Sequence, residues 1–257
     1  MKKTIMITGA TSGFGKAIAV QFATHGYNIV ATGRRHDRLV QLQQELEAAH
    51  NITVTTLCFD IRDKKQVADA VQSLKKNHRN VDILVNNAGL AAGMAPIDQG
   101  DTDDWDLMID TNIKGLLYVT REMLPLLKGS ASPHIFNIGS TAGKMAYKNG
   151  NVYCSTKFAV DALNQSMRID LLPYGIKVTA INPGMAETEF SLVRFKGDAD
   201  RAGKVYEDLQ PLRAEDIANV VYYCATLPPH VCINDLTLTC TNQANAVYTV
   251  RDSEKIK

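Results

Sequence analysis

The sequence has no excess of charge of either sign and no long apolar run. Its 28 lysine and arginine residues stand against 27 aspartate and glutamate residues, a formal net charge of +1. A nucleic-acid-binding protein needs clustered positive charge, which this balance does not supply. No segment approaches the roughly 18 uninterrupted apolar residues of a membrane span, and the apolar run near the N-terminus stops at Gly9, too early for a signal peptide. We expect neither a nucleic-acid partner nor membrane association.

Cysteine is also scarce. The chain has five cysteines, an odd number, and none of them forms a Cys-x-x-Cys pair. Paired cysteines at fixed spacing mark zinc sites and disulfide frameworks, so neither is expected, and the six histidines show no spacing typical of metal ligands. Reduced thiols in a cytoplasmic protein are the simplest interpretation. We therefore predict a cytoplasmic location and no metal site.

What the sequence does contain is a regular alternation of two patterns. Short runs rich in valine, isoleucine and threonine alternate with segments of helical period, over 257 residues with 45% hydrophobic content. This alternation predicts βαβ units in a parallel sheet covered by helices on both faces, in a single domain spanning residues 1–257. Strands are expected at residues 4–8, 28–33, 53–59, 81–86, 134–138, 177–181 and 236–240. Helices are expected at residues 13–25, 37–50, 63–78, 103–128, 152–174 and 214–226, with an interruption near Asn112.

The segment from Pro183 to Pro211 is the longest one without a predicted element, and it follows the sixth strand. Ligands of open α/β sheets bind at the carboxyl ends of the strands, and long irregular segments in compact domains often form lids or binding loops. We expect a substrate-capping segment over about residues 185–212. The alternative is a surface excursion without a function.

A glycine-rich turn joins the first expected strand to the first expected helix. Glycine permits a tight turn and the close approach of a ligand, and the free N–H groups of a helix N-terminus attract a pyrophosphate. A turn of this kind at the start of a βαβ series predicts a dinucleotide site. Its residues are Gly9, Ala10, Thr11, Ser12, Gly13, Phe14 and Gly15.

The end of the second strand indicates which dinucleotide binds. In an NAD site, an Asp or Glu about 20 residues beyond the turn holds the ribose 2′-hydroxyl. Here the strand ends in Arg34 and Arg35, with no acid at its tip. Guanidinium groups grip a 2′-phosphate, so we predict NADP(H). Asp37 is the nearest acid and fits better as the cap of the next helix, while a solvated turn is the alternative for the two arginines.

Tyr153 and Lys157 lie four residues apart, so a helix places both side chains on one face. An ammonium close to a phenol lowers the phenol pKa from about 10, which lets the phenol exchange protons near neutral pH. A solvated helix face is the alternative for this pair taken alone. Ser140 follows the fifth strand, so it can converge with the pair at one sheet edge, beside the predicted cofactor.

The chain resembles the short-chain dehydrogenase/reductase family over essentially its whole length. The motifs that carry the resemblance are the turn at residues 8–15, Asp60 after the third strand, Asn86 to Gly89, Asn112, Ser140, Tyr153 with Lys157, and Pro183 and Gly184 with Thr188. The resemblance implies a Rossmann-like, doubly wound sheet of about seven parallel strands between two helix layers. It also implies reversible hydride transfer between a nicotinamide and a carbonyl or alcohol, and a homotetramer built as a dimer of dimers.

The roles of the matching residues follow from the resemblance. Tyr153 is expected to be the general acid/base, and Lys157 to lower its pKa and hold the nicotinamide ribose. Ser140 is expected to polarise the substrate oxygen, and Asn112 to anchor a water that relays the proton. Besides the glycine-rich turn, Arg34, Arg35, Tyr153 and Lys157, the expected cofactor contacts are Asp60 and Ile61 at the adenine, Asn87, Ala88 and Gly89 at the adenosine ribose, and Pro183, Gly184 and Thr188 at the nicotinamide end.

Within the family, four stretches are most similar to the NADP-dependent 3-hydroxy acid (serine, L-allo-threonine) dehydrogenases: residues 83–90, 108–112, 137–143 and 188–198. The chain departs from that group at residues 185–187. The resemblance implies substrates such as L-serine, L-allo-threonine, 3-hydroxyisobutyrate, and 3-hydroxypropionate with malonic semialdehyde.

A 3-hydroxy acid needs a cation for its carboxylate, and Arg194 and Lys196 are the candidates in the capping segment. The alternative is that both are solvated or pair with Asp198 or Glu189. Two other functions compete with this one: an NADPH-dependent reductase of other ketones, quinones or sugars, and a non-catalytic dinucleotide-sensing protein. A sensing protein is expected to lose the catalytic residues, which are all present.

Overall fold

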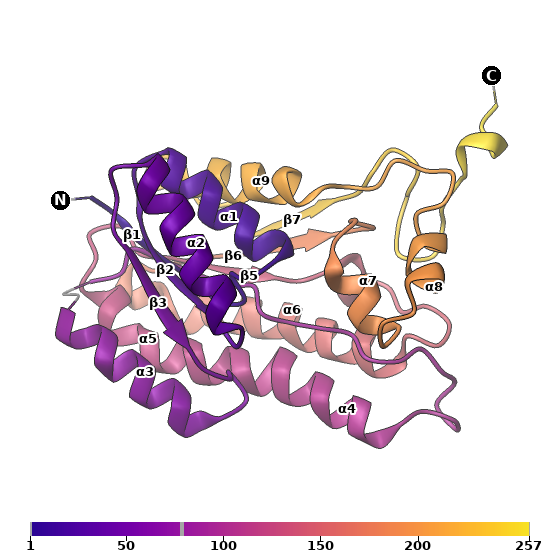
Figure 1. Ribbon diagram of the computed structural model, residues 1–257, viewed down its shortest axis with the longest axis horizontal. Coiled ribbons are helices and arrows are strands. Elements are labelled where there is room, and N and C mark those ends of the chain that lie inside the picture. The colour runs from indigo at the N-terminus through magenta and orange to yellow at the C-terminus, as the bar shows by residue number, and fades with distance from the viewer. Residues whose placement is uncertain (1, 78–79, 257) are drawn as a thin grey trace.

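The computed structural model describes residues 2–77 and 80–256 and is shown in Figure 1. Seven parallel strands form a sheet in the order β3-β2-β1-β4-β5-β6-β7. The strands are β1 (Thr4–Ile7), β2 (Asn28–Gly33), β3 (Val54–Cys58), β4 (Ile83–Asn86), β5 (His134–Ile138), β6 (Lys177–Pro183) and β7 (Asp235–Leu238).

Helices connect the strands and cover both faces of the sheet. In Figure 1, α1, α2 and α9 lie on one face, and α3, α4, α5 and α6 lie on the other. The α-helices are α1 (Gly13–Thr24), α2 (His36–Ala49), α3 (Lys64–Asn77), α4 (Thr102–Ile109), α5 (Leu116–Lys128), α6 (Asn151–Leu171), α7 (Glu189–Arg194), α8 (Ala199–Lys204) and α9 (Ala214–Thr226). A π-helix, η1 (Asp110–Gly115), joins α4 to α5, and 3₁₀ turns lie at η2 (Thr141–Gly143), η3 (Leu172–Tyr174) and η4 (Asp252–Glu254).

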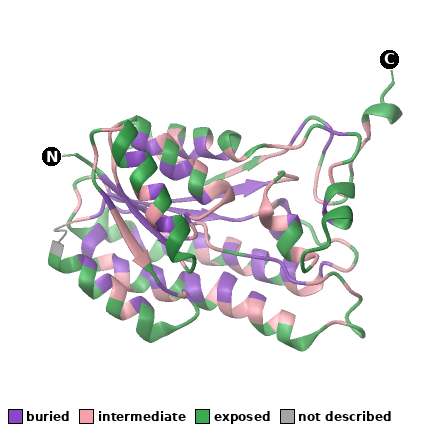
Figure 2. Cartoon of the chain, viewed as in Figure 1, coloured by how far each residue is buried: buried purple, intermediate pink, exposed green. Residues whose placement is uncertain are grey.

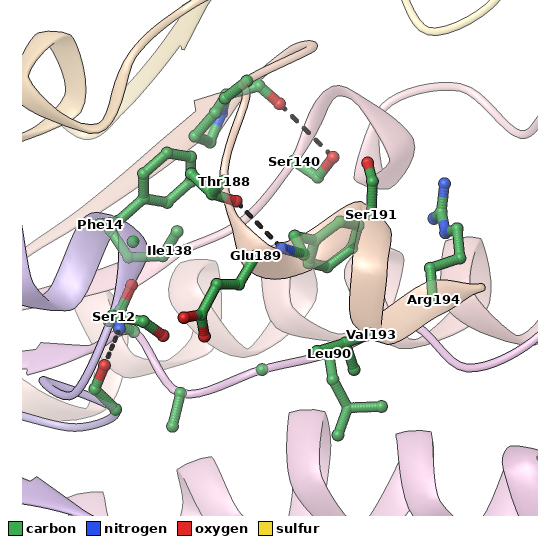
Figure 3. A pocket seen from close by; sticks show the side chains of 18 of the residues that line it. Ser12, Phe14, Leu90, Ile138, Ser140, Thr188, Glu189, Ser191, Val193 and Arg194 are labelled. Atoms are coloured by element: carbon green, nitrogen blue, oxygen red, sulfur yellow. Dashed lines mark hydrogen bonds between the residues drawn. The ribbon is translucent and has the colours of Figure 1, made fainter. Parts of the chain in front are cut away.

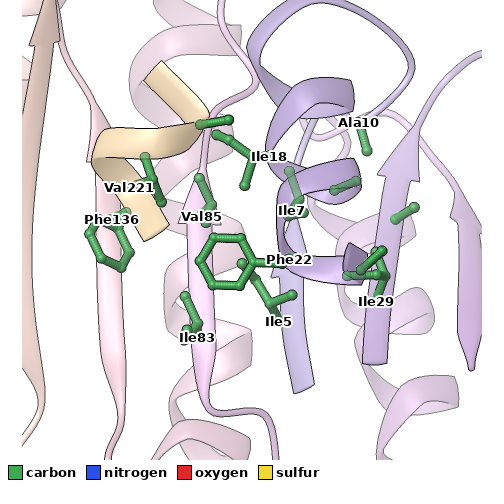
Figure 4. Packing of buried hydrophobic residues seen from close by; sticks show 14 of the residues in the cluster. Ile5, Ile7, Ala10, Ile18, Phe22, Ile29, Ile83, Val85, Phe136 and Val221 are labelled. Atoms are coloured by element: carbon green, nitrogen blue, oxygen red, sulfur yellow. The ribbon is translucent and has the colours of Figure 1, made fainter. Parts of the chain in front are cut away.

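The core lies in two hydrophobic layers, one on each side of the sheet. On one side Phe22 of α1 and Val221 of α9 belong to the same cluster as Ile7 of β1 (Figure 4). On the other side Met123 of α5 belongs to the cluster of Met6, the neighbour of Ile7 in β1. Successive strand residues point to opposite faces, so a strand covered on both sides must be apolar throughout. Figure 2 shows the consequence, with the central strands buried and the outer faces of the helices exposed.

The strand order reverses beside β1. The chain moves outward from β1 through β2 to β3, and then returns to place β4 on the other side of β1. Ile7 accordingly pairs with Ala31 of β2 and with Val85 of β4. The connections that follow these strands leave in opposite directions, so a crevice opens at the carboxyl ends of β1 and β4. Ligands of doubly wound sheets bind in this crevice.

The predicted fold class is confirmed, and every expected strand is present within a few residues of its expected bounds. The interruption expected near Asn112 is the π-helix η1. The stretch from Pro183 to Pro211, for which no element is predicted, contains the short helices α7 and α8. The expected cap at Asp37 is wrong, because α2 begins at His36 and Asp37 lies exposed in its first turn. The expected end of the third helix, His78, lies outside the described residues.

Among residues 2–77 and 80–256, no helix combines the length and apolar character that crossing a membrane requires.

Candidate active site

A cavity of about 520 Å³ opens at the carboxyl ends of the central strands, and Figure 3 shows the side chains around part of it. Its walls come from the glycine-rich turn after β1, the ends of β2 to β6, and the capping segment. Most predicted site residues line it: Gly9, Thr11, Ser12, Gly13, Phe14, Arg34, Arg35, Asp60, Ile61, Asn87, Ala88, Gly89, Ser140, Tyr153, Lys157, Pro183, Gly184, Thr188 and Arg194. Ala10, Gly15 and Asn112 do not line the cavity and lie behind its wall.

The glycine-rich turn is held in a shape that only glycine tolerates well. Gly9 and Gly13 have φ angles of +68° and +50°, in the left-handed region. A Cβ atom on Gly15 would lie 2.3 Å from the carbonyl oxygen of Gly9, so no side chain fits there. The hydroxyl of Thr8 accepts hydrogen bonds from the backbone N–H groups of Asn87 and Ala88 at 3.0 and 2.9 Å, which ties the turn to the end of β4. A pyrophosphate can therefore approach the backbone at the N-terminus of α1.

Arg35 lies at the tip of β2 and contacts the same turn. Its Nε donates to the Thr11 hydroxyl at 3.1 Å, and its Nη2 donates to the Ser12 hydroxyl at 2.7 Å. Its Nη1 donates to Glu189 of the capping segment at 2.8 Å. The neighbouring Arg34 lies 3.8 Å from the carboxylate of Asp60. Guanidinium and hydroxyl groups gathered at one point fit a phosphate group, so the residues present suit an NADP 2′-phosphate.

Asp60 and Ile61 form the wall after β3. Arg62 forms a two-point pair with Asp60, with donor–acceptor distances of 3.1 Å from Nε to Oδ1 and 2.6 Å from Nη2 to Oδ2. Partial burial raises the pKa of Asp60, but the hydrogen bonds from Arg62 outweigh this effect and the net shift is downward. Ile61 packs against Gly115 of η1, where a Cβ atom would lie 2.7 Å from the Ile61 side chain. The arrangement leaves an ionised carboxylate facing the cavity.

Asn112 fixes the loop that follows β4. Its Oδ1 accepts from the backbone N–H of Leu90 at 2.9 Å, and its Nδ2 donates to the carbonyl of Leu90 at 2.8 Å and to the Thr156 hydroxyl at 3.0 Å. The side chain of Asn112 is buried, in the π-helix between α4 and α5. Since Thr156 precedes Lys157 on α6, Asn112 connects the end of β4 to the helix that carries Tyr153 and Lys157.

Tyr153 and Lys157 lie on α6 and Ser140 follows β5, as predicted. The Lys157 Nζ donates to the carbonyl of Ile138 at 2.9 Å, and the Ser140 hydroxyl donates to the carbonyl of Pro183 at 3.4 Å. Burial lowers the pKa of Lys157 to about 8. Burial also raises the pKa of Tyr153 above its ordinary value, while the charge of Arg194 and a hydrogen bond from Ser140 oppose that rise.

Arg194 and Ser140 are the groups that act on the Tyr153 pKa against the effect of burial in this structure. The Lys157 Nζ lies 6.0 Å from the centroid of the Tyr153 ring and donates a hydrogen bond to the carbonyl of Ile138. The cation nearest to the ring is Arg194, whose Cζ lies 4.8 Å from the same centroid. Desolvation disfavours a charged phenolate in a closed site, which is why burial dominates.

Arg194 lies at the C-terminus of α7 and its guanidinium is aimed into the site. Its Nη2 donates to the Tyr147 hydroxyl at 2.7 Å, and its Cζ lies 5.1 Å from the centroid of the Phe190 ring. Its Nε is buried and has no hydrogen-bond partner within the described chain. Figure 3 shows Glu189 on the side of Ser12 and Arg194 on the opposite side of the same helix. A buried N–H without a partner is costly, so this position favours an anionic ligand.

The capping segment is held over the cavity from several sides. The backbone N–H of Met185 donates to the Gln243 side chain at 2.7 Å, and the Tyr206 hydroxyl donates to the carbonyl of Ala186 at 2.8 Å. Thr188 caps α7 by accepting a hydrogen bond from the backbone N–H of Phe190 at 3.2 Å. These hydrogen bonds hold the capping segment in place as one wall of the cavity.

Several residues at the site were not predicted from the sequence. Tyr147 and Gln243 line the cavity without having been predicted, whereas Glu189 and Tyr206, which also line it, belong to the segment expected to cap the substrate. For Tyr147 the signal is its position on the connection between Ser140 and Tyr153, two residues predicted to be catalytic. Gln243 lies beyond the last strand and carries no local signal.

A family model described as short chain dehydrogenase matches residues 3–198. The chain belongs to this family. It is 45% identical over 250 residues to the NADP-dependent 3-hydroxy acid dehydrogenase YdfG of Salmonella typhi, covering 97% of this chain and 99% of that protein. It is also 45% identical over 251 residues to sulfoacetaldehyde reductase 2 of Chromohalobacter salexigens, covering 97% and 99% of the two chains. Serine 3-dehydrogenase of Agrobacterium fabrum is 44% identical over 254 residues, which cover 97% of this chain and 98% of that protein.

Solved structures agree with the sequence relatives. The closed form of a serine dehydrogenase complexed with NADP⁺ superposes with a TM-score of 0.89 at 43% identity, covering 96% of this chain and 99% of that chain. The family, the fold and the cofactor NADP(H) are thereby confirmed. The chain is an NADP-dependent oxidoreductase of the short-chain family that acts on hydroxyl groups.

Proposed function

We propose that the chain catalyses reversible hydride transfer between NADP(H) and a small 3-hydroxy acid or its 3-oxo acid. L-serine, L-allo-threonine, 3-hydroxyisobutyrate and 3-hydroxypropionate with malonic semialdehyde are the substrates of this class. The observation that carries the proposal is Arg194, a cation 4.8 Å from the Tyr153 ring centroid, with a buried Nε that lacks a partner within the described chain. A substrate carboxylate satisfies this group while the reacting carbon lies near Tyr153.

The catalytic residues take the roles of the family. NADP(H), when bound, supplies or accepts the hydride. Tyr153 gives its phenolic proton to the substrate oxygen during reduction and takes it back during oxidation. Ser140 donates a hydrogen bond to the same oxygen, where negative charge develops. Lys157 holds the nicotinamide ribose, and Asn112 anchors a water on the route of the proton to solvent.

The cofactor contacts follow the walls of the cavity. The glycine-rich turn from Gly9 to Gly15 carries the pyrophosphate, and Arg34 and Arg35 carry the 2′-phosphate. Asp60 and Ile61 hold the adenine, while Asn87, Ala88 and Gly89 line its ribose. Pro183, Gly184 and Thr188 lie at the nicotinamide end. Support comes from the position of these residues along one continuous cavity.

Sulfoacetaldehyde is a second candidate substrate. A relative that is 45% identical over 251 residues is named sulfoacetaldehyde reductase 2. Sulfoacetaldehyde and malonic semialdehyde both carry an anionic group one methylene from the aldehyde carbon, so Arg194 suits either group. The two aldehydes differ in the size and geometry of their anionic group. A direct comparison of their rates of reduction shows which of them the enzyme prefers.

The test is a kinetic comparison of wild type and Arg194→Ala, with NADP⁺ and the four hydroxy acids, and with NADPH and the two aldehydes. Arg194→Ala is expected to lower kcat/KM for anionic substrates by about 10- to 100-fold, the effect of losing a charge-assisted hydrogen bond. Uncharged alcohols and aldehydes should be affected little. Tyr153→Phe should lower kcat for every substrate by about 100-fold or more.

Arg201→Ala is the matched control for Arg194→Ala. Arg201 belongs to the same capping segment but is exposed and stacks on Phe195, with 4.4 Å between its Cζ and the ring centroid. The kcat/KM values of Arg201→Ala should match those of the wild type. An unchanged kcat/KM for 3-hydroxy acids and for sulfoacetaldehyde in Arg194→Ala would remove Arg194 from the substrate site. Activity confined to ketones, quinones or sugars would replace the proposal by the competing reductase function.

We also propose that the chain acts as a single domain with a capping segment at about residues 185–212, assembled as a homotetramer. Support for assembly comes from exposed apolar side chains: Leu117 on α5, Phe158 and Ile169 on α6, and Leu172 at the start of η3. A cytoplasmic location is proposed from the five cysteines, which are all free thiols.

A further inference from the structure

Glu189, the first residue of α7, reaches across the cavity mouth to the cations at the tip of β2. Its Oε2 accepts from Arg35 Nη1 at 2.8 Å, and its Oε1 accepts from Arg38 Nη1 at 2.7 Å. One carboxylate therefore joins the capping segment to the end of β2 and to the first turn of α2. In Figure 3 the Glu189 carboxylate lies between α7 and the glycine-rich turn at Ser12.

Arg35 is also one of the two arginines predicted to hold the 2′-phosphate, with Arg34. Among the described residues, the Arg35 side chain forms hydrogen bonds with Glu189 and, in the glycine-rich turn, with Thr11 and Ser12. The side chain of Arg38 lies beside it on the same carboxylate. A phosphate and a carboxylate repel each other at contact distance, and each needs N–H groups of the same guanidinium.

We propose that Glu189 is a cofactor-specificity residue whose carboxylate competes with the 2′-phosphate of NADP(H) for Arg35 and Arg38. Binding of NADP(H) then exchanges one anion for another and frees α7 from the tip of β2. NAD(H) lacks the phosphate, so its binding leaves the contacts of Glu189 with Arg35 and Arg38 in place. The inference depends on the cofactor alone and stands whichever substrate the enzyme uses.

The charge state of Glu189 supports competition over the whole working pH range. Partial burial raises its pKa, but hydrogen bonds from Arg35 and Arg38 outweigh this and lower the pKa to about 2. Its carboxylate is therefore ionised at any pH at which the enzyme would be assayed. The Glu189 and Arg35 side chains are each 41% exposed, so the pair is screened by water and salt and can be exchanged reversibly.

The first test measures binding of NADP⁺ and NAD⁺ to the full-length protein by isothermal titration calorimetry. Glu189→Gln keeps the size of the side chain and removes the competing charge. It is expected to lower Kd for NADP⁺ by about 3- to 10-fold, because one anion fewer opposes the phosphate. The Kd for NAD⁺ should change by less than about twofold. An NADP⁺ Kd that is unchanged, or higher, in Glu189→Gln overturns the proposal.

Glu187→Gln is the control for this measurement. Glu187 is an exposed carboxylate two residues earlier in the same segment, and within residues 2–77 and 80–256 it forms no ion pair with an arginine. The Glu187→Gln substitution removes one negative charge from the capping segment, as Glu189→Gln does, but leaves the hydrogen bonds of Arg35 intact. If Glu187→Gln tightens NADP⁺ binding as much as Glu189→Gln does, the effect is one of net charge, and the proposal fails.

The second test measures the opening of α7 in the absence of catalysis. Hydrogen exchange of the α7 amides is followed with 2′,5′-ADP, which carries the 2′-phosphate but no nicotinamide, and with 5′-AMP. In the wild type, 2′,5′-ADP should speed exchange in α7 and 5′-AMP should not, since only the former displaces Glu189. In Glu189→Gln, exchange should be fast from the start and insensitive to 2′,5′-ADP. Equal responses of the wild type to the two ligands would contradict displacement.

Discussion

His134 is a buried ionisable side chain that lies outside the cavity. It begins β5 and is 2% exposed, and its Nε2 lies 2.8 Å from the Thr179 hydroxyl. That hydroxyl donates to the carbonyl of Ile233 at 2.6 Å, so it accepts from His134 and the proton sits on Nε2. Burial, and next the charge of Lys177, lower the pKa of His134 to about 3. The imidazole is neutral in the fold at any pH near neutrality.

This shift predicts a loss of stability in mild acid. An unfolded histidine has a pKa of about 6.5, so between pH 6.5 and about 3 the unfolded chain binds a proton that the folded chain refuses. The free energy of unfolding should therefore fall with decreasing pH, by up to about 1.4 kcal/mol per pH unit. Denaturant unfolding at pH 7, 6 and 5 measures this slope in wild type and in His134→Gln.

In His134→Gln the slope between pH 7 and 5 should be smaller by this one-proton contribution. His36→Gln is the control, because it removes an exposed histidine at the start of α2 in place of a buried one. Parallel pH profiles for wild type and His134→Gln would show that His134 does not cause the acid sensitivity.

Site residues differ in how visible they are in the sequence. Ser140, Tyr153 and Lys157 follow local rules, since each occupies a fixed place after a strand or on a helix. Glu189 and Arg35 are 154 positions apart and meet only through the reach of two side chains. Sequence spacing cannot reveal such a pair, because nothing local distinguishes Glu189 from the nearby Glu187.

At the scale of elements, the predictable parts are long and periodic. The seven strands and the longer helices carry the apolar patterns that packing on a sheet demands. The helices α7 and α8 have six residues each, too short to show a helical period, and depend on caps at Thr188 and Asp198. Their positions are set by tertiary contacts such as the Tyr206 hydrogen bond to Ala186. For this reason the sequence predicts a capping segment from its place after β6 but does not predict the two short helices within it.

The π-helix η1 depends on Asn112 for its contact with the loop after β4. Asn112→Ala leaves the backbone N–H and carbonyl of Leu90 without the side-chain partners that they have now. Each unpaired buried group costs about 1–3 kcal/mol, so we expect a loss of about 2–4 kcal/mol in the free energy of unfolding. Chemical denaturation without substrate measures this cost separately from any role of Asn112 in proton transfer.

Gln72→Ala is a suitable control for Asn112→Ala. Gln72 is exposed on α3, and its replacement should change the free energy of unfolding by no more than about 0.5 kcal/mol. If Asn112→Ala is as stable as Gln72→Ala, the π-helix does not require the amide of Asn112.

At the scale of the whole molecule, α5 and α6 expose apolar side chains that a homotetramer would cover. Phe158 is 45% exposed and lies on α6 with Ile169, which is 73% exposed. Phe158→Glu places a charge in this patch, and burying an unpaired charge in an interface is costly. The wild type should elute as a tetramer in size-exclusion chromatography with light scattering, and Phe158→Glu should shift to a smaller species with an unchanged circular dichroism spectrum.

Val20→Glu serves as the control for assembly. Val20 is 39% exposed on α1, on the opposite side of the sheet from α6 (Figure 1). The Val20→Glu variant should have the same oligomer mass in solution as the wild type. A wild-type chain that is monomeric at every concentration tested would exclude the tetramer.

The hydrogen bond between the Met185 N–H and Gln243 bears on how the site forms during synthesis of the chain. Residue 243 is synthesised long after the glycine-rich turn, Ser140, Tyr153 and Lys157 have left the ribosome. Those residues can reach the sheet while the chain is still growing, but the backbone N–H of Met185 gains its side-chain partner only when the last part of the chain arrives. A chain that stops short of Gln243 retains every motif of the family and still lacks the hydrogen bond from the Met185 N–H to Gln243. Carrying all the motifs therefore does not ensure a finished enzyme.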